Sequence, residues 1–495
     1  MSTLVWFRLR RVGAPVRRGI AVSAAAAALS VAACSDNTSP SGPNAAPQIE
    51  AATVTKPDSA GPVLIATFAA PRADSARIVA TSASGGLHVT TDYVPVVNDS
   101  ARVVLAGLHP GVAYAWHVEA IGPGGSRNGK GLTVTADTAP QAIRGAQIVT
   151  TSGTAPTVPY IMTELVVDSV KYEAIFDSTG TLVWYRIMRR PSGQGDFEMQ
   201  PTGVFTAYDG TSAGWQQVTG TWFAFGLDGA VQKTWTAPSG SFTDPHEFRL
   251  RVAAGDTTAY YAIYAIAPID MSAHCGTSAQ PTAQHTLVRA DAGGLHTIFE
   301  ARTRFTPNDW ASPPVCGLGD FDHPNAFDFD GDHTLIVSWR NLGALTAIDL
   351  TTGGVLWQLG GAQSTLALSG DPLGGTGGQH SVRVSGPGTV VVYDNGTNHV
   401  PPQSRMVEYA IDTTTAVARL TRQYLHPGGI YTTFMGSVSP LATGGVLIGW
   451  STAATITEVD ANGNLVWEGV LQLGGVSQQF YRALPLGSLY HFQQP

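Results

Sequence analysis

Three histidines, one arginine and one asparagine stand where strand-like runs of the sequence meet loops. His246, His323 and His380 each follow or precede Asp, Pro, Gln or Gly, and Arg340 and Asn325 lie in the same kind of position. An imidazole can act near neutral pH as a nucleophile or as a general acid or base. A guanidinium offers a planar fork that matches tetrahedral oxyanions such as sulfate or phosphate. With no carboxylate counted in the set, these residues predict an electropositive pocket for such an anion.

Two other interpretations of the histidines stay open from the residues alone. Three imidazoles are also enough to bind zinc or copper, but Arg340 would repel a cation held close by, so no metal is predicted. Any single histidine is also compatible with a hydrogen-bonded turn residue that has no role in chemistry. An accidental placement of three at equivalent positions of a repeat is the weaker interpretation.

The spacing of these residues indicates a repeat. His323 and His380 are 57 residues apart, and Ser437 follows His380 by another 57 residues. Each of these positions, like His246, precedes or begins an apolar strand-like run. Equal spacing over a structural repeat places equivalent positions at one height around a common axis. We therefore expect the three histidines to converge at one opening of a central channel. Arg340 follows His323 by one hairpin and is expected to reach the same place.

A second repeated pattern has a similar spacing and predicts the fold class. An apolar strand, an Asp, a Gly turn and a strand that often ends in Trp recur beyond residue 150, with the Asp residues 48 to 63 residues apart. The six members of this series are Asp177, Asp228, Asp291, Asp349, Asp412 and Asp460. Such spacing is typical of four-stranded propeller blades with added loops. The prediction is an all-β chain with a six-bladed β-propeller over residues 145–495; five or seven blades stay possible.

Composition agrees with a folded, turn-rich protein. The chain has 495 residues, 56 Gly, 31 Pro, 43% apolar and 13% charged residues, and a net charge of −8. The first 33 residues carry five Arg and no acid, so the remainder carries −13 (−8 minus 5). This acidic balance, with no basic patch, argues against binding of nucleic acid.

The N-terminus predicts export. Residues 1–33 combine a basic segment with a short apolar run, which is typical of a signal peptide and too short to span a membrane. The run ends at Cys34 and resembles a bacterial lipobox, so Cys34 is the predicted lipidation site; a plain signal peptide with an incidental cysteine is the alternative. Residues 34–47 read as a flexible Ser/Pro tether. We expect an exported bacterial lipoprotein, membrane-anchored on the periplasmic or cell-surface side.

Residues 48–140 predict a small β-sandwich. Alternating strands separated by turn signals fit that architecture. The run Leu108-His-Pro-Gly-Val-Ala-Tyr114 resembles the corner of a fibronectin type III domain, in which the Tyr hydroxyl bonds back to the backbone. A spacer or docking role is expected for this module. In the same oxidising compartment, Cys275 and Cys316 form a candidate disulfide, although sequence does not show that they are close.

The stretch from about 240 to 470 resembles the bacterial arylsulfate sulfotransferases. The resemblance is carried by His323-Pro-Asn325, Ser338-Trp-Arg340, Asp349…Gly354…Trp357, Gln379-His380, Tyr393-Asp-Asn-Gly396 and Ser404-Arg405. It implies an exported six-bladed propeller that moves a sulfuryl group between phenols, without the nucleotide donor PAPS, through a sulfated histidine. His380 is then the nucleophile, and Arg340, His246 and His323 hold the sulfate oxygens with support from Asn325. Ser437 and Tyr481 are expected to line the substrate site.

The expected partners are a small aryl sulfate donor and a phenolic acceptor, with no cofactor and no nucleic acid. Two alternatives from other classes remain. One is a non-catalytic cell-surface propeller that binds glycan or protein ligands. The other is a quinoprotein-like redox propeller, suggested by the Gly…Trp turns but unsupported by an adjacent cysteine pair or an acidic metal set.

Overall fold

The computed structural model describes residues 45–188, 195–212, 218–253, 255–311 and 319–490. Almost all regular structure in these residues is β-strand, so the all-β prediction is confirmed. The predicted signal peptide, most of the tether, Cys34 and Cys316 lie outside the described residues. No helix among the described residues is long and apolar enough to cross a membrane.

The N-terminal module consists of two sheets that pack face to face. One sheet contains β1 (Thr53–Thr55), β3 (Leu64–Ala69) and β7 (Ser100–Leu105). The other contains β4 (Ser75–Ser82), β5 (His88–Thr90), β6 (Val94–Pro95), β8 (Ala113–Gly122), β9 (Gly125–Asn128) and β10 (Leu132–Thr135). Alternate residues of β4, β7 and β8 are buried, as expected for strands with one face on a core.

Tyr114 makes the hydrogen bond to the backbone that the sequence predicts for this module. The backbone N–H of His109 donates to the hydroxyl of Tyr114 at 3.0 Å. Tyr114 is 1% exposed and packs in the core shared by the two sheets. The likeness to a fibronectin type III domain as a whole stays a prediction.

Beyond this module the described strands form six further sheets, numbered 1 to 6 here in chain order. Sheet 1 contains β38 (Leu484–Leu486), β12 (Tyr160–Val167), β13 (Val170–Asp177), β14 (Leu182–Ile187) and β2 (Ala60–Gly61). Sheet 2 contains β15 (Phe197–Met199), β16 (Phe205–Ser212), β17 (Val218–Phe225) and β18 (Val231–Trp235). Sheet 3 contains β19 (Phe242–Ala253), β20 (Asp256–Met271), β21 (Thr277–Asp291), β22 (Gly294–Glu300) and β23 (Gly319–Asp320). The four-residue helix α1 (Ser272–Cys275) caps the β20–β21 hairpin.

The remaining sheets repeat the pattern. Sheet 4 contains β24 (Pro324–Asp330), β25 (Thr334–Trp339), β26 (Ala344–Asp349) and β27 (Val355–Gly360). Sheet 5 contains β29 (His380–Gly386), β30 (Thr389–Asp394), β31 (Arg405–Asp412), β32 (Val417–Leu425) and β28 (Ala367–Ser369). Sheet 6 contains β33 (Ser437–Pro440), β34 (Val446–Trp450), β35 (Thr455–Val459), β36 (Leu465–Leu473), β11 (Ala146–Ser152) and β37 (Val476–Ser477).

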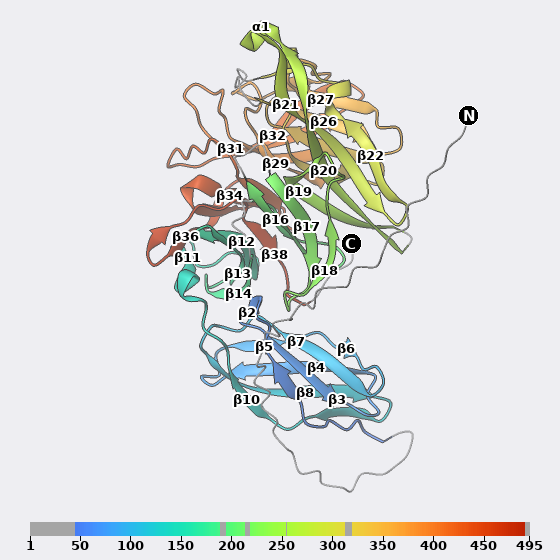
Figure 1. Ribbon diagram of the computed structural model, residues 1–495. Coiled ribbons are helices and arrows are strands. Elements are labelled where there is room, and N and C mark those ends of the chain that lie inside the picture. The colour runs from blue at the N-terminus through green and yellow to red at the C-terminus, as the bar shows by residue number, and fades with distance from the viewer. Residues whose placement is uncertain (1–44, 189–194, 213–217, 254, 312–318, 491–495) are drawn as a thin grey trace, which may run out of the picture.

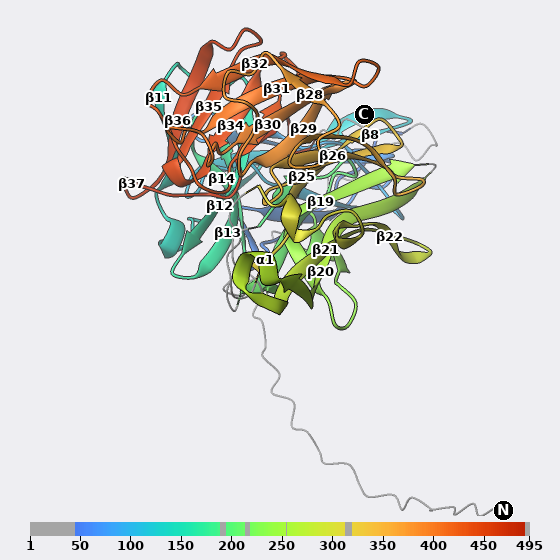
Figure 2. The same ribbon diagram turned by 90° about the horizontal axis from the view of Figure 1, so that it is seen from above.

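Inner strands of successive sheets contact one another in a closed ring. β12 contacts β15, β16 contacts β19, β19 contacts β24, β24 contacts β29, β29 contacts β33, and β33 contacts β38, which pairs with β12. Seen from above, the sheets are arranged around a common axis (Figure 2). Segments from the beginning and the end of the propeller region close the circle, because β38 supplies the first strand of sheet 1 and β11 an outer strand of sheet 6. This is the architecture of a β-propeller; we interpret the six sheets as its blades.

The repeated Asp residues occupy one structural position. All six lie at the turn between the third and fourth strand of a sheet, where a side-chain oxygen accepts the backbone N–H two residues later. The bonded pairs are Asp177 with Thr179, Asp228 with Ala230, Asp291 with Gly293, Asp349 with Thr351, Asp412 with Thr414 and Asp460 with Asn462. An Asp that closes its own turn in this way explains why the residue recurs with the sheet.

The N-terminal module packs on the face of the propeller that carries these Asp turns (Figure 1). His109 contacts Asp177 at 2.8 Å and Arg102 contacts Asp228 at 2.6 Å. In a four-stranded antiparallel sheet the turn before the last strand lies opposite the start of the first strand. The module therefore leaves open the face on which the first strands begin.

Candidate active site

The three histidines meet at the open face of the ring. His246 lies on β19, His323 directly precedes β24, and His380 is the first residue of β29. The ring centroids of His246 and His323 are 4.6 Å apart, and those of His323 and His380 are 6.4 Å apart. The structure thus brings together the residues that the 57-residue spacing placed at one height.

Carboxylates fix two of these rings, which corrects the expectation of a pocket without acids. Nδ1 of His246 contacts the two carboxylate oxygens of Asp244 at 3.0 and 3.1 Å. Nδ1 of His323 contacts Oδ2 of Asp320. A carboxylate only accepts hydrogen bonds, so each Nδ1 carries a proton and each Nε2 is free to face the site. The signal was available in sequence, because Asp244 lies two residues before His246 and Asp320 three residues before His323.

His380 is oriented by an amide instead of a carboxylate. The side-chain N–H groups of Asn395 donate to the carbonyls of Thr432 at 2.9 Å and Met435 at 3.0 Å. Its Oδ1 therefore faces Nδ1 of His380 at 2.7 Å and accepts that proton. The backbone N–H of Met435 points at Nε2 of His380 at 3.2 Å, which identifies Nε2 as the nitrogen with the lone pair.

The environment keeps His380 uncharged. Its side chain is 4% exposed. Burial, followed by the positive charge of Arg340 and the nearby His323, lowers the pKa of His380 well below its usual value. Burial also lowers the pKa of His323, although Asp320 opposes this shift. A neutral imidazole with a defined Nε2 lone pair is the form that acts as a nucleophile.

Arg340 follows β25 and supplies the cation of the site. Its backbone N–H donates to the carbonyl of His323 at 2.9 Å, which holds the two residues together. Nη2 of its guanidinium donates to the carbonyl of Thr433 at 3.2 Å. Because one guanidinium has five N–H donors, donors of Arg340 remain for an anionic ligand.

The side chains of Asn325, Ser437 and Tyr481 lie near the histidines, and each donates a hydrogen bond to a backbone carbonyl. Asn325 donates to the carbonyl of Gln379, the residue before His380, at 2.7 Å. The hydroxyl of Ser437 donates to the carbonyl of Ala483 at 3.1 Å and joins sheet 6 to the segment before β38. The ring of Tyr481 is 6.1 Å from that of His246, and its hydroxyl donates to the carbonyl of His246 at 3.2 Å. These contacts give the three residues positions that support the site.

A buried histidine that the sequence analysis missed joins the supporting carboxylates. His285 on β21 contacts Oδ1 of Asp322 through Nδ1 and Oδ2 of Asp244 through Nε2 at 3.3 Å. Burial opposes its charge, but the two carboxylates raise the pKa of His285 well above its usual value. Asp322 also accepts the backbone N–H of His323 at 2.9 Å. His285 is thus an imidazolium that ties the supports of His246 and His323 to each other.

The same cluster has the residue types of a metal site but not the free lone pairs. His285, Asp320 and Asp322 are close enough together to hold an ion. However, both ring nitrogens of His285 already face carboxylates, so this residue has no lone pair to offer a metal. The residues fit an ion-pair network better than a ligand set.

Replacing His285 with glutamine is expected to lower the free energy of unfolding by about 3 kcal/mol, because it leaves buried carboxylates without their cation. With its raised pKa, His285 contributes stability that is fully present below pH ~6.5 and is lost as the pH rises through the folded-state pKa. The difference from wild type should therefore shrink toward alkaline pH. Denaturant titrations at several pH values measure it.

The matched control is His296→Gln on the neighbouring β22. His296 pairs with Asp291 at 3.2 Å, and its side chain is 42% exposed. An exposed pair of this kind is worth less than about 1 kcal/mol. Equal stability losses in the two variants would contradict the role given to His285.

Buried ion pairs fill the ring beneath the histidines. Glu247, which follows His246, contacts Arg383 of β29 at 3.0 Å and Arg482 at 2.9 Å. Arg482 also donates to the carbonyl of Asn325 at 2.9 Å and contacts Asp196 at 2.8 Å. These contacts link sheets 3, 4 and 5 to the segments before β15 and β38, so they hold in register the strands that carry the site.

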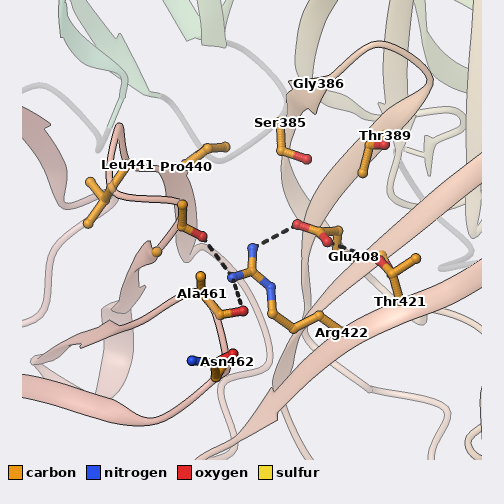
Figure 3. Close-up of a pocket in the computed structure, with 12 residues that line it drawn as sticks. Ser385, Gly386, Thr389, Glu408, Thr421, Arg422, Pro440, Leu441, Ala461 and Asn462 are labelled. Atoms are coloured by element: carbon orange, nitrogen blue, oxygen red, sulfur yellow. Dashed lines mark hydrogen bonds and ion pairs between the residues drawn. The ribbon is translucent and has the colours of Figure 1, made fainter.

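A cavity of about 500 Å³ lies at the other end of sheets 5 and 6 (Figure 3). Ser385 and Pro440, near the ends of β29 and β33, contribute to its lining. Arg422 within it donates to Glu408 at 2.7 Å and to the carbonyl of Gly444 at 2.9 Å. Its charge is therefore already paired, and the cavity is separated from His380 by the length of β29.

Comparison with known proteins identifies the segment that holds most of these residues. Residues 317–472 match the family model described as Arylsulfotransferase (ASST). This stretch of the chain is therefore similar to the arylsulfotransferases. The match contains His323, Arg340 and His380 and supports aryl sulfotransferase activity in general terms. No curated protein matches the sequence.

Solved structures resemble this chain only distantly. A protein of unknown function from Bacteroides caccae has a TM-score of 0.43 and 12% identity, with 67% of this chain and 100% of that chain covered. A functionally unknown protein from Desulfotomaculum acetoxidans has a TM-score of 0.36 and 11% identity over 74% and 95% of the chains. The periplasmic gluconolactonase of Pseudomonas aeruginosa has a TM-score of 0.37 and 12% identity over 65% and 98%. Likenesses at this level carry no argument about function.

Of the two cysteines in the predicted disulfide, only Cys275 lies within the described residues. It is disulfide-bonded. The pairing proposed with Cys316 stays a prediction.

Proposed function

We propose that this protein is a PAPS-independent aryl sulfotransferase that works by a ping-pong mechanism through a sulfohistidine at His380. The observation that carries the proposal is the neutral, Asn395-bound imidazole of His380, whose Nε2 faces a site that also contains Arg340 and two further histidines. The donor is a phenolic sulfate ester and the acceptor a phenol. No cofactor is required for either step.

In the first step, the Nε2 lone pair of His380 attacks the sulfur of the aryl sulfate. The N–S bond forms as the bond between sulfur and the aryl oxygen breaks, and the electron pair leaves with the phenolate, which takes a proton from solvent. Sulfation makes the imidazole cationic, and the Nδ1–H bond to Asn395 stabilises that charge. Arg340 donates to the sulfuryl oxygens and stabilises the charge in transfer; His246 and His323 can donate to them only when Nε2 is protonated.

In the second step, the oxygen of the acceptor phenol attacks the sulfur of sulfohistidine. His323, whose lowered pKa keeps it neutral, takes the phenol proton and passes it to solvent. The N–S bond breaks and its electron pair returns to Nε2 of His380. The enzyme is regenerated, and the backbone N–H of Met435 again bonds Nε2 as in the structure.

The proposed place of action rests on the N-terminal sequence. We propose an exported lipoprotein that is anchored to a membrane through lipidated Cys34, with the enzyme on the periplasmic or cell-surface side. The acidic remainder of the chain and the tether of residues 34–47 are compatible with this arrangement. Loss of membrane association in a Cys34→Ala variant, measured by fractionation, tests it.

The activity is tested with the protein that begins after Cys34, a chromogenic aryl sulfate such as 4-nitrophenyl sulfate, and phenol. Release of nitrophenol that rises with phenol, together with formation of phenyl sulfate, is the expected result. Release that ignores phenol would identify a hydrolase on the same scaffold. No release over a panel of donors would favour the non-catalytic ligand-binding propeller.

The pH dependence of the first step is a further prediction. Because the pKa of His380 lies well below its usual value, Nε2 stays unprotonated as the pH falls through 6.5. The rate of His380 sulfation in a single turnover is expected to stay level from pH 8 to about 6, whereas an ordinary histidine would lose half of its nucleophile near pH 6.5. A rate that falls with a midpoint near 6.5 would contradict the assignment of a neutral, buried nucleophile.

A further inference from the structure

A short segment between β32 and β33 is bonded directly to the residues of the site. The carbonyl of Thr433 accepts from Arg340 at 3.2 Å, and the N–H of Met435 donates to Nε2 of His380 at 3.2 Å. Asn395, which orients His380, holds the carbonyls of Thr432 and Met435. The backbone of residues 432–435 therefore forms one edge of the place that the sulfuryl group is proposed to occupy.

The segment is held firmly at both ends. The hydroxyl of Thr432 bonds that of Tyr393 at 2.6 Å, and its N–H donates to Ser404 at 2.9 Å. At the other end, Gly436 has a φ of +107°, and a Cβ there would lie 2.3 Å from the ring of Tyr393. Only glycine fits this approach. The side chains on the segment are consequently presented from a fixed backbone.

Two large aromatic side chains, one on this fixed segment and one directly before it, are exposed to solvent. Tyr431 is 39% exposed and Phe434 is 46% exposed. Tyr93 is the one other Phe, Tyr or Trp of the described residues that is exposed to this degree. No ring contact to another described residue is found for Tyr431 or Phe434. Burial lowers the pKa of Arg340, and Asp320 and Tyr431 oppose this shift. Exposed apolar groups that gather at one place mark binding surfaces more often than isolated ones do.

We propose that Tyr431 and Phe434 form the aryl subsite, which receives the aromatic ring of the phenolic substrate while its oxygen faces His380. The inference rests on the proposed sulfotransferase function and identifies where its ring specificity arises. With the sulfuryl group placed between Arg340 and His380, the attached ring lies beside the segment that contacts both. Aromatic pairs and ring burial favour a planar aryl group over an alkyl chain of equal size.

The same segment couples ring binding to the chemistry. A ring placed on Phe434 packs one residue from the N–H that bonds Nε2 of His380 and one residue from the carbonyl that holds Arg340. An aromatic substrate is thereby aligned with the nucleophile and the cation, which is the geometric requirement for fast transfer. An aliphatic alcohol lacks this alignment and is expected to be a poor acceptor.

The test compares Tyr431→Ala and Phe434→Ala with wild type and with Leu465→Ala. Leu465, 42% exposed, begins β36 at the opposite face and serves as the matched control. Each ring removal is expected to lower kcat/KM for phenol about tenfold, corresponding to a stacking contribution of about 1.4 kcal/mol. Sulfuryl transfer to water, which has no ring, should change less than about twofold. Unchanged kcat/KM for phenol in both variants would overturn the proposal.

A binding measurement separates failure of the subsite from failure of the function. Calorimetric titration of the purified protein with 4-nitrophenol, without any sulfate donor, is expected to show binding in wild type and Leu465→Ala and a loss of about tenfold in affinity in the two ring variants. If wild type never transfers a sulfuryl group but binds nitrophenol through these rings, the subsite stands and the proposed function falls. If wild type does not bind nitrophenol, or if the ring variants bind it equally well, the subsite is overturned.

Discussion

Replacement of His380 with asparagine is expected to lower sulfuryl transfer by at least about a thousandfold, because the variant has no nucleophile. Asparagine keeps a polar group that can bond Asn395, so the buried position stays hydrogen-bonded. The effect should fall on kcat, since Arg340 still binds the donor. Rates of nitrophenol release with and without phenol measure the loss.

The control for this variant is His333→Asn, at the exposed β24–β25 turn of sheet 4. It removes an imidazole from the same propeller without touching the site and should retain wild-type rates. Thermal unfolding of both variants shows whether the fold is kept. Substantial transfer by a folded His380→Asn protein would assign the nucleophile to another residue.

Replacement of Arg340 with methionine is expected to lower kcat about a hundredfold to a thousandfold, because one preorganised cation then no longer faces the charge in transfer. Methionine roughly preserves the length of the side chain but removes the bond to Thr433 and the positive charge. Arg340→Lys retains the charge without the fork and should give an intermediate loss. Arg289→Met on β21, whose guanidinium pairs with Asp291 at 2.8 Å, is the matched control.

The pH dependence of the Arg340→Met variant separates the effect of the lost charge from the effect of altered packing. The charge of Arg340 is, after burial, a cause of the lowered pKa of His380. Without it, the pKa of His380 should rise toward its usual value, so sulfation of His380 should fall off at a higher pH than in wild type. A reduced rate with an unchanged pH profile would assign Arg340 to substrate orientation alone.

The sequence predicts this site well where the repeat determines it. The 57-residue spacing of His323, His380 and Ser437 places them at equivalent positions, and the structure brings the histidine rings within 6.4 Å of their neighbours. The Asp at the turn between the third and fourth strand of each sheet can also be predicted, because its side chain bonds the backbone two residues later. Features that recur within one sheet can be predicted from spacing and turn chemistry.

The residues that orient the histidines could not be found by the same means. Asn395 follows the second strand of sheet 5, and His285 lies on the third strand of sheet 3. Their contacts depend on how the loop before β33 and the segment before β24 fold back, which no periodic pattern encodes. Asp244 and Asp320 were within reach, since both lie close to their histidines in sequence. The closure of the ring by β11 and β38 joins segments more than 300 residues apart and is likewise invisible to local pattern.

The most direct test of the central claim is mass analysis of the protein after a brief reaction with an aryl sulfate in the absence of acceptor, quenched at alkaline pH. One sulfuryl group is expected on the peptide that contains His380; it should disappear when phenol is added and appear in equal amount as phenyl sulfate. A sulfuryl group on another peptide, or transfer to phenol in a protein that never carries one, would contradict the sulfohistidine mechanism.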